Sequence, residues 1–146
     1  LLLMLLNKGP AREPGMKAMV SMAEDGCSFD CAEYCMGMGA CEEGKTEDLF
    51  EDCFELWKEN VTVNELQRDA WIKRLNRWIE LRVSAIMEAN RRNYYGECAA
   101  FVAAFGEMLQ SSGVADAKES VMQRYRKEYS RRRAFHEELR GYGMKS

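Results

Sequence analysis

Cysteines carry the clearest chemical signal in this chain of 146 residues. Five of the six crowd into residues 27–53 and the sixth stands far from them; they are Cys27, Cys31, Cys35, Cys41, Cys53 and Cys98. Six thiols can form three disulfides, and such clustering is usual in small domains of oxidising compartments. A bridge across a loop of this size contributes roughly 2–4 kcal/mol to stability. All six cysteines are therefore disulfide candidates.

A helical hairpin would give these cysteines a preferred pairing. If the chain turns near Glu42, then Cys31 and Cys53 lie at equal distances from the turn and can face each other. Cys27 or Cys35 could then reach Cys98. This hypothesis rests on hairpin symmetry alone.

Two other states of the cysteines stay open. They could be reduced thiols buried in a core. Alternatively, a zinc ion could be held by the four thiolates of Cys27, Cys31, Cys35 and Cys41. Structural zinc sites usually use paired short spacings, and no second pair is present here. We therefore predict no bound metal.

The cysteine spacing invites one family comparison. Nine residues separate Cys31 from Cys41, and three separate Cys31 from Cys35. These spacings resemble single arms of the twin-cysteine helical hairpins of the mitochondrial intermembrane space. A second arm is missing, because Trp57 and Val63 stand where a partner of Cys53 would fall. The resemblance therefore implies a stapled hairpin and not membership of the family.

Few other residues have the types and spacing that catalysis requires. His136 is the only histidine, and on a helix its neighbours Glu137 and Glu138 would point elsewhere. The chain has no Gly-rich phosphate loop, no Gly-x-Ser-x-Gly sequence and no His-Glu-x-x-His sequence. We predict that the protein is not an enzyme, that it needs no cofactor and that it has no small-molecule substrate.

The charges are strongly polarised although the net charge is only −3. Residues 21–60 carry a net charge of −10, whereas residues 118–146 carry +5. Such polarity favours oriented docking on partners or contact between the two ends of the chain. The overall acidity argues against nucleic acid as a partner. Aromatic and basic residues that could form an interface lie in the second half of the chain. These partner-interface candidates are Trp71, Trp78, Tyr125, Tyr129, Arg131, Arg132 and Arg133.

Hydrophobic periodicity predicts helices and no strands. We expect a helix after Thr46, and a longer one opened by the capping box Thr62–Glu65 and extending to about Asn90. Residues 98–109 are rich in alanine and predict a helix buried between others. A single last helix is expected over residues 116–140, ended by Gly141 and Gly143.

These patterns predict an all-α protein of four or five helices with a disulfide-stapled, cysteine-rich helical hairpin and an extended N-terminal arm. Residues 1–26 form the arm, residues 27–60 the acidic hairpin, and residues 61–146 a long-helix bundle with a basic C-terminal helix. The apolar run Leu1–Leu6 is too short to span a bilayer. It is either the remnant of a targeting peptide or an arm that packs on a neighbour.

The function expected from this architecture is non-catalytic. We expect an accessory subunit of an organellar energy-converting membrane complex, respiratory or photosynthetic, on its oxidising soluble side. That side is the thylakoid lumen or the mitochondrial intermembrane space, and peripheral membrane contact is compatible with it. The alternatives are a free secreted helical binding protein and a thiol redox or metal-binding protein.

Overall fold

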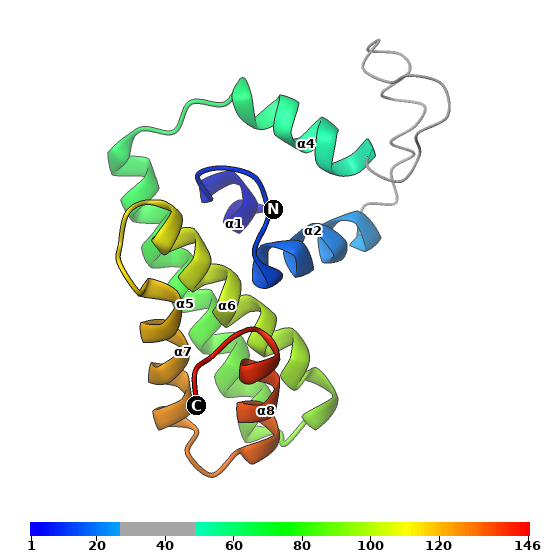
Figure 1. The fold of residues 1–146 in the computed structure, drawn as a ribbon, viewed down its shortest axis with the longest axis vertical. Helices are drawn as coiled ribbons and strands as arrows, with labels where there is room; N and C mark the ends of the chain where they lie inside the picture. The colour runs from blue at the N-terminus through cyan, green and yellow to red at the C-terminus, as the bar shows by residue number, and fades with distance from the viewer. Residues whose placement is uncertain (27–48) are drawn as a thin grey trace.

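A computed structural model describes residues 1–26 and 49–146, and every regular element in them is helical (Figure 1). The elements are α1 (Leu2–Leu6), α2 (Pro14–Gly26), α4 (Leu49–Glu59), α5 (Glu65–Glu88), the 3-10 turn η1 (Arg92–Tyr94), α6 (Tyr95–Ser111), α7 (Ala117–Glu128) and α8 (Arg133–Gly141). The all-α prediction is confirmed. The predicted number of helices was too low, because the described residues alone contain seven α-helices.

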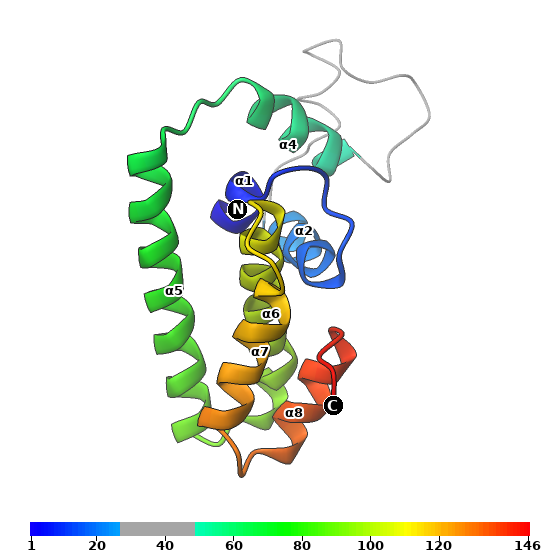
Figure 2. The same ribbon diagram turned by 60° about the vertical axis from the view of Figure 1, so that its left-hand side comes forward.

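Helix α6 is the central element of the fold. It packs against α1, α2, α5, α7 and α8, and α5 lies along one edge of the molecule in Figure 2. Its sequence explains this position, because four alanines and Gly106 let neighbouring backbones approach closely on several sides. Nine of the 12 residues from Ala99 to Gln110 are buried. The predicted burial of this helix is therefore confirmed.

Two glycines set the distances between α6 and its neighbours. A Cβ atom on Gly15 would lie 2.5 Å from the backbone nitrogen of Ala104, so α2 crosses α6 with almost no side chain between them. A Cβ atom on Gly106 would lie 2.5 Å from the Cα atom of Lys118 on α7. Because both obstacles are backbone atoms, neither contact can be relieved by a change of rotamer.

The predicted extended N-terminal arm is wrong, because residues 1–26 contain two helices packed on α6. Proline at the first position of α2 suits a helix start. The apolar side chains that looked unpatterned in sequence, such as Leu6 and Met16, are fully buried here. The composition of residues 1–26 did not indicate α2, because a tertiary contact from α6 accepts the N–H groups of its first turn.

That contact comes from Glu107, which is only 5% exposed. Its Oε1 accepts the backbone N–H of Gly15 at 2.9 Å, and its Oε2 accepts that of Met16 at 2.7 Å. Lys118 Nζ lies 2.9 Å from Oε1. The buried carboxylate therefore caps α2, where the helix dipole favours negative charge, and pairs with a cation of α7. We call Glu107, Lys118 and these two N–H groups the Glu107 cluster.

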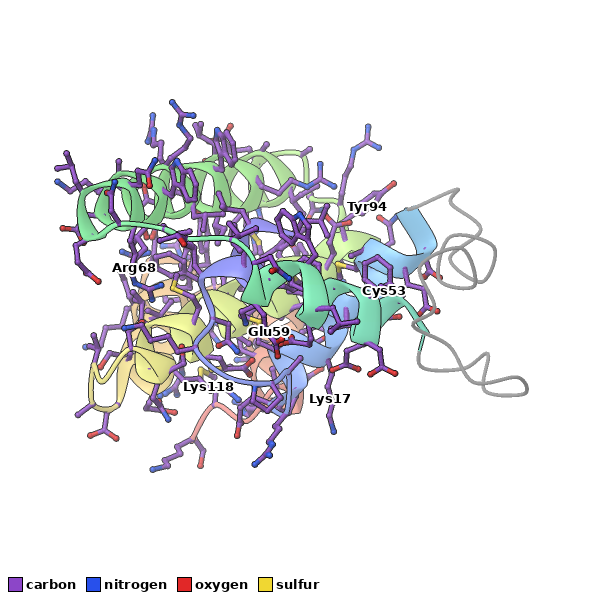
Figure 3. The ribbon with its side chains drawn as sticks, turned by 90° about the horizontal axis from the view of Figure 1, so that it is seen from above. Lys17, Cys53, Glu59, Arg68, Tyr94 and Lys118 are labelled. Atoms are coloured by element: carbon purple, nitrogen blue, oxygen red, sulfur yellow. The ribbon has the colours of Figure 1, made fainter. Side chains whose placement is uncertain are left out.

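A buried arginine of α5 joins the carboxyl ends of α1 and α6. Arg68 extends from α5 and donates to the carbonyl oxygen of Leu6 at 2.7 Å and to the hydroxyl of Ser112 (Figure 3). Leu6 is the last residue of α1 and Ser112 is the C-cap of α6. The guanidinium therefore lies at the carboxyl ends of two helices, where the dipole favours a cation.

Helix α5 begins two residues later than its sequence indicated, because its N-cap is not Thr62. Its N-cap is Asn64, whose side chain accepts the N–H of Gln67 at 2.8 Å, while Gln67 Oε1 accepts the N–H of Asn64 at 3.2 Å. The capping box is therefore Asn64–Gln67 and not Thr62–Glu65. The predicted long helix is otherwise confirmed, since α5 extends to Glu88.

The single C-terminal helix predicted over residues 116–140 is two helices, α7 and α8. Between them, Arg132 donates to the carbonyl of Met87 and to Asn90 Oδ1, both at 2.7 Å. The turn lets Phe135 and Leu139 fold back into the core, where both are fully buried. A straight helix would have carried these side chains away from α6, so burial overrides the local helical preference.

Substitution of Gly106 tests the close crossing of α6 and α7. We expect Gly106→Ala to lower the free energy of unfolding by about 2 kcal/mol, because overpacking costs roughly 1–3 kcal/mol. Gly141→Ala is the matched control, since a Cβ atom there meets nothing within 4 Å. The control should be neutral or slightly stabilising. Urea denaturation measures both, and equal stability of the two variants would contradict the crossing.

Substitution of Glu107 tests the cluster that holds α2. Both carboxylate oxygens accept backbone N–H groups. In Glu107→Gln the side-chain NH2 group replaces one of these oxygens and faces an N–H donor. We expect a loss of about 3 kcal/mol, typical of breaking a buried ion pair. Glu128→Gln, at an exposed position of α7, should change stability by less than about 0.5 kcal/mol. Equal losses in urea denaturation would show that Glu107 has no special role.

Candidate partner-binding surface

The outer face of α5 exposes large side chains that a lone domain would normally cover. Trp78 is 55% exposed and Leu81 is 49% exposed. Arg74, Trp78, Leu81 and Ala85 follow one another at helical spacing, with Arg77 beside them. We call these five residues the α5 outer face. The opposite face of the same helix, which includes Leu75, Ile79 and Val83, is buried against the core.

A groove of about 390 Å³ adjoins the α5 outer face. Residues from α1, α2, α5 and α6 line it, together with Leu1. Apolar side chains form nearly all of its lining: Leu1, Leu2, Leu3, Met19, Leu75, Trp78, Ile79 and Phe101. We call it the α1/α5 groove. Trp78 belongs to both the groove and the outer face, so the two make one continuous apolar surface.

Cations line the rim of this surface. Arg82 donates to Glu97 Oε1 from Nε at 2.9 Å and from Nη2 at 2.8 Å, which closes one end of the groove. The hydrogen bond with Glu97 raises the pKa of Arg82 above its ordinary value, so the guanidinium stays charged. Arg74 lies over the Trp78 ring, 5.9 Å from its centroid. Tryptophan and arginine are the residues most enriched at the energetic centres of interfaces.

The structure separates the two tryptophans that the sequence grouped together. Trp78 lies on the outer face, whereas Trp71 is half-buried and packs against the core. The two predicted interface residues therefore belong to two different apolar stripes of α5. One faces α6, and the other, around Trp78 and Leu81, faces solvent.

The C-terminal interface candidates divide in the same way. Tyr125 lies in the core, and burial raises the pKa of its phenol to about 12. Tyr129 is half-buried, with its ring 6.2 Å from that of Phe135. Arg132 holds the turn between α7 and α8, so its role is structural. Only Arg131 and Arg133 are exposed as expected. Tyr125 is thus removed as an interface residue.

The structure describes two of the six cysteines, Cys53 and Cys98. Cys98 is a free thiol on α6 with no exposed surface, so the predicted bridge from Cys98 to Cys27 or Cys35 is wrong. The helices packed around α6 enclose this side chain. Cys53 lies half-buried on α4. Cys27, Cys31, Cys35 and Cys41 lie outside the described residues, so the Cys31–Cys53 pairing stays a prediction.

Sequence reasoning missed several parts of this surface. Leu81 was not singled out, although it continues the Arg74–Trp78 spacing by three residues. That spacing was the available signal, since it marks a second apolar stripe on α5. The groove walls from Leu1–Leu3 and Phe101 had no signal in sequence, because the docking of α1 beside α5 depends on contacts between distant segments.

The described residues contain no cluster of three or more histidine, cysteine, aspartate or glutamate side chains suited to a metal ion. No helix in that part of the chain has the length and apolarity needed to cross a membrane. Comparisons with protein-family models, curated proteins and solved structures find no match. The function is therefore argued from the surface itself.

The state of Cys98 gives a direct test of the core. Burial raises the pKa of its thiol to about 11, with the adjacent Glu97 acting in the same direction. At pH 8 only about 0.1% of such a thiol is ionised, and the thiolate is the reactive form.

We expect iodoacetamide to leave Cys98 unmodified in the native protein at pH 8 and to modify it fully in denaturant, as measured by peptide mass spectrometry. Modification of native Cys98 at the rate of a small-molecule thiol would contradict its enclosure. A reductant is included so that other cysteines report the reagent's activity.

Proposed function

We propose that this protein is a non-catalytic helical subunit that binds a partner protein through the α5 outer face and the α1/α5 groove. The observation that carries the proposal is the exposure of Trp78 and Leu81 beside a groove with an apolar lining. Apolar surface of this kind is costly in water and typically marks a site of association.

The chemistry of the surface favours an acidic amphipathic helix as the partner. A groove accepts the apolar face of such a helix through side chains at helical spacing. The exposed cations Arg74 and Arg77 stand beside the apolar stripe and would pair with carboxylates flanking that face. The bound helix would cover Trp78 and Leu81 and leave the rim charges in partly hydrated contacts.

The proposal for the place of this assembly rests on the sequence alone. We propose an organellar energy-converting membrane complex, respiratory or photosynthetic, with this subunit on the oxidising side. The support is the clustering of five cysteines in residues 27–53, for which an oxidising compartment is the usual setting. A disulfide staple between Cys31 and Cys53 belongs to the same proposal.

A second function is favoured by the groove itself. Small-molecule sites are concave, mostly apolar and typically about 300–1,000 Å³ in volume. At about 390 Å³ the α1/α5 groove falls within that range. A free, secreted carrier of a small apolar ligand is therefore the alternative, and it predicts a monomer with an extractable ligand.

Chromatography of a native extract distinguishes the two functions. We expect the tagged wild-type chain to elute with a larger assembly, and the Trp78→Ala/Leu81→Ser variant to elute as a single chain. Loss of a central tryptophan costs about 2 kcal/mol or more, which is roughly a 30-fold loss of affinity. Both side chains are half-exposed, so the thermal midpoint of the isolated variant should change little.

Leu66→Ser is the matched control, because Leu66 is 82% exposed on the same helix but does not line the groove. It should leave the assembly intact. A photo-crosslinker at position 81 should mark a helical partner segment that is both acidic and apolar. Elution of the wild-type chain alone, with an apolar small molecule bound, would overturn the subunit proposal in favour of the carrier.

A further inference from the structure

Helices α7 and α8 lie at the end of the bundle away from α4 (Figures 1 and 2). Residues of both helices line a second groove. Its volume is about 480 Å³. Both walls are polar faces at helical spacing, with Arg126, Lys127 and Ser130 on the α7 side. On the α8 side Arg133, His136 and Arg140 line it, with Glu137 among them. We call it the α7/α8 groove.

The charges of this groove are unbalanced. Four cations, Arg126, Lys127, Arg133 and Arg140, face a single carboxylate. Within the described residues none of the four has an ion pair within 4.0 Å, and Arg126 donates only to Gln123 Oε1 at 3.3 Å. By contrast, the cations Arg82 and Lys118 elsewhere in the protein have carboxylate partners at 2.8 and 2.9 Å. Like charges gathered without a close ion-pair partner repel one another, and a bound anion would reduce that cost.

The groove is held in shape by contacts beneath it. Arg132 fixes the turn between the two helices to the carboxyl end of α5. His136 is 8% exposed, and its Nε2 donates to the Tyr129 carbonyl at 3.0 Å. Phe135 packs edge-on against the Tyr129 ring at 6.2 Å. The two walls are thus set before any ligand arrives, which reduces the entropy cost of binding.

We propose that the α7/α8 groove binds a phosphate monoester group. A phosphate dianion offers three terminal oxygens to several donors at once, and arginine matches them with paired N–H groups. A single carboxylate would satisfy one arginine and leave the remaining cations facing each other. Helix α8 also begins at this groove, with Arg133 as its first residue and no side-chain cap, so its positive end adds to the attraction.

Titration with inorganic phosphate at constant ionic strength, followed by NMR, tests the site. We expect shifts confined to α7 and α8, and an association constant about tenfold lower in Arg133→Gln and in Arg140→Gln. Arg140→Lys keeps the charge but loses the paired donors, so its loss should be smaller. In phosphate-free buffer Arg140→Gln should not lower the thermal midpoint, because it relieves repulsion.

Arg131→Gln is the matched control, since Arg131 is exposed in the same basic stretch but does not line the groove. It removes the same charge and should weaken phosphate binding by less than about twofold. An equal loss in Arg131→Gln and Arg140→Gln, or no binding of phosphate to the wild type, would overturn the proposal.

Vesicles distinguish a lipid headgroup from a soluble phosphate as the source. Binding to phosphatidylcholine vesicles that contain phosphatidate, lost in Arg140→Gln, would assign the phosphate to a lipid. Binding of inorganic phosphate without vesicle binding would assign it to a soluble ligand. Equal binding to phosphatidate and phosphatidylserine vesicles, unaffected by Arg140→Gln, would show diffuse attraction and overturn the site.

Discussion

The buried carboxylate of Glu107 is the contact on which the arrangement of helices depends. It satisfies two N–H groups at the start of α2 and pairs with Lys118 of α7, so one side chain of α6 orients both neighbours. The contact is possible only because Gly15 and Gly106 let the backbones of α2 and α7 approach α6. A buried charge is costly unless it is paired and hydrogen-bonded, and here both carboxylate oxygens are used. The two glycines therefore allow the close approach of the helices, and the contacts of Glu107 stabilise it.

The position of α6 in turn decides which surfaces are left uncovered. Because α1, α2, α7 and α8 occupy its other sides, α5 contacts the core along one face only. That geometry leaves Trp78 and Leu81 in solvent, although the same helix buries Leu75 and Ile79. Arg68 fixes the start of α5 at the ends of α1 and α6, so the exposed face keeps a defined orientation beside the α1/α5 groove. The proposed docking surface is thus a consequence of how the core is filled.

The two grooves differ in chemistry and lie on different elements. The α1/α5 groove is apolar with a basic rim, and the α7/α8 groove is polar with four cations facing one carboxylate. The two grooves are connected through the turn between α7 and α8, because Arg132 binds this turn to the carboxyl end of α5. A subunit with these features would bind a partner helix at the α1/α5 groove and an anionic group at the α7/α8 groove. The acidic α4, which carries Glu51, Asp52, Glu55 and Glu59, lies over α1 and α2 at the opposite end from α8.

The sequence by itself determined the helical class, the long α5 and the burial of the alanine-rich α6, because hydrophobic periodicity is a local property. It also revealed the charge polarity and singled out Trp71 and Trp78 together, but it could not show that only Trp78 is exposed. Only the tertiary structure decided that residues 1–26 are helical and packed, that Cys98 is an enclosed free thiol, and that the last helix is broken at Arg132. Each of these outcomes rests on contacts between distant segments. Glu107 and Gly15 are 92 residues apart, and no local pattern encodes which helix end a buried carboxylate will cap.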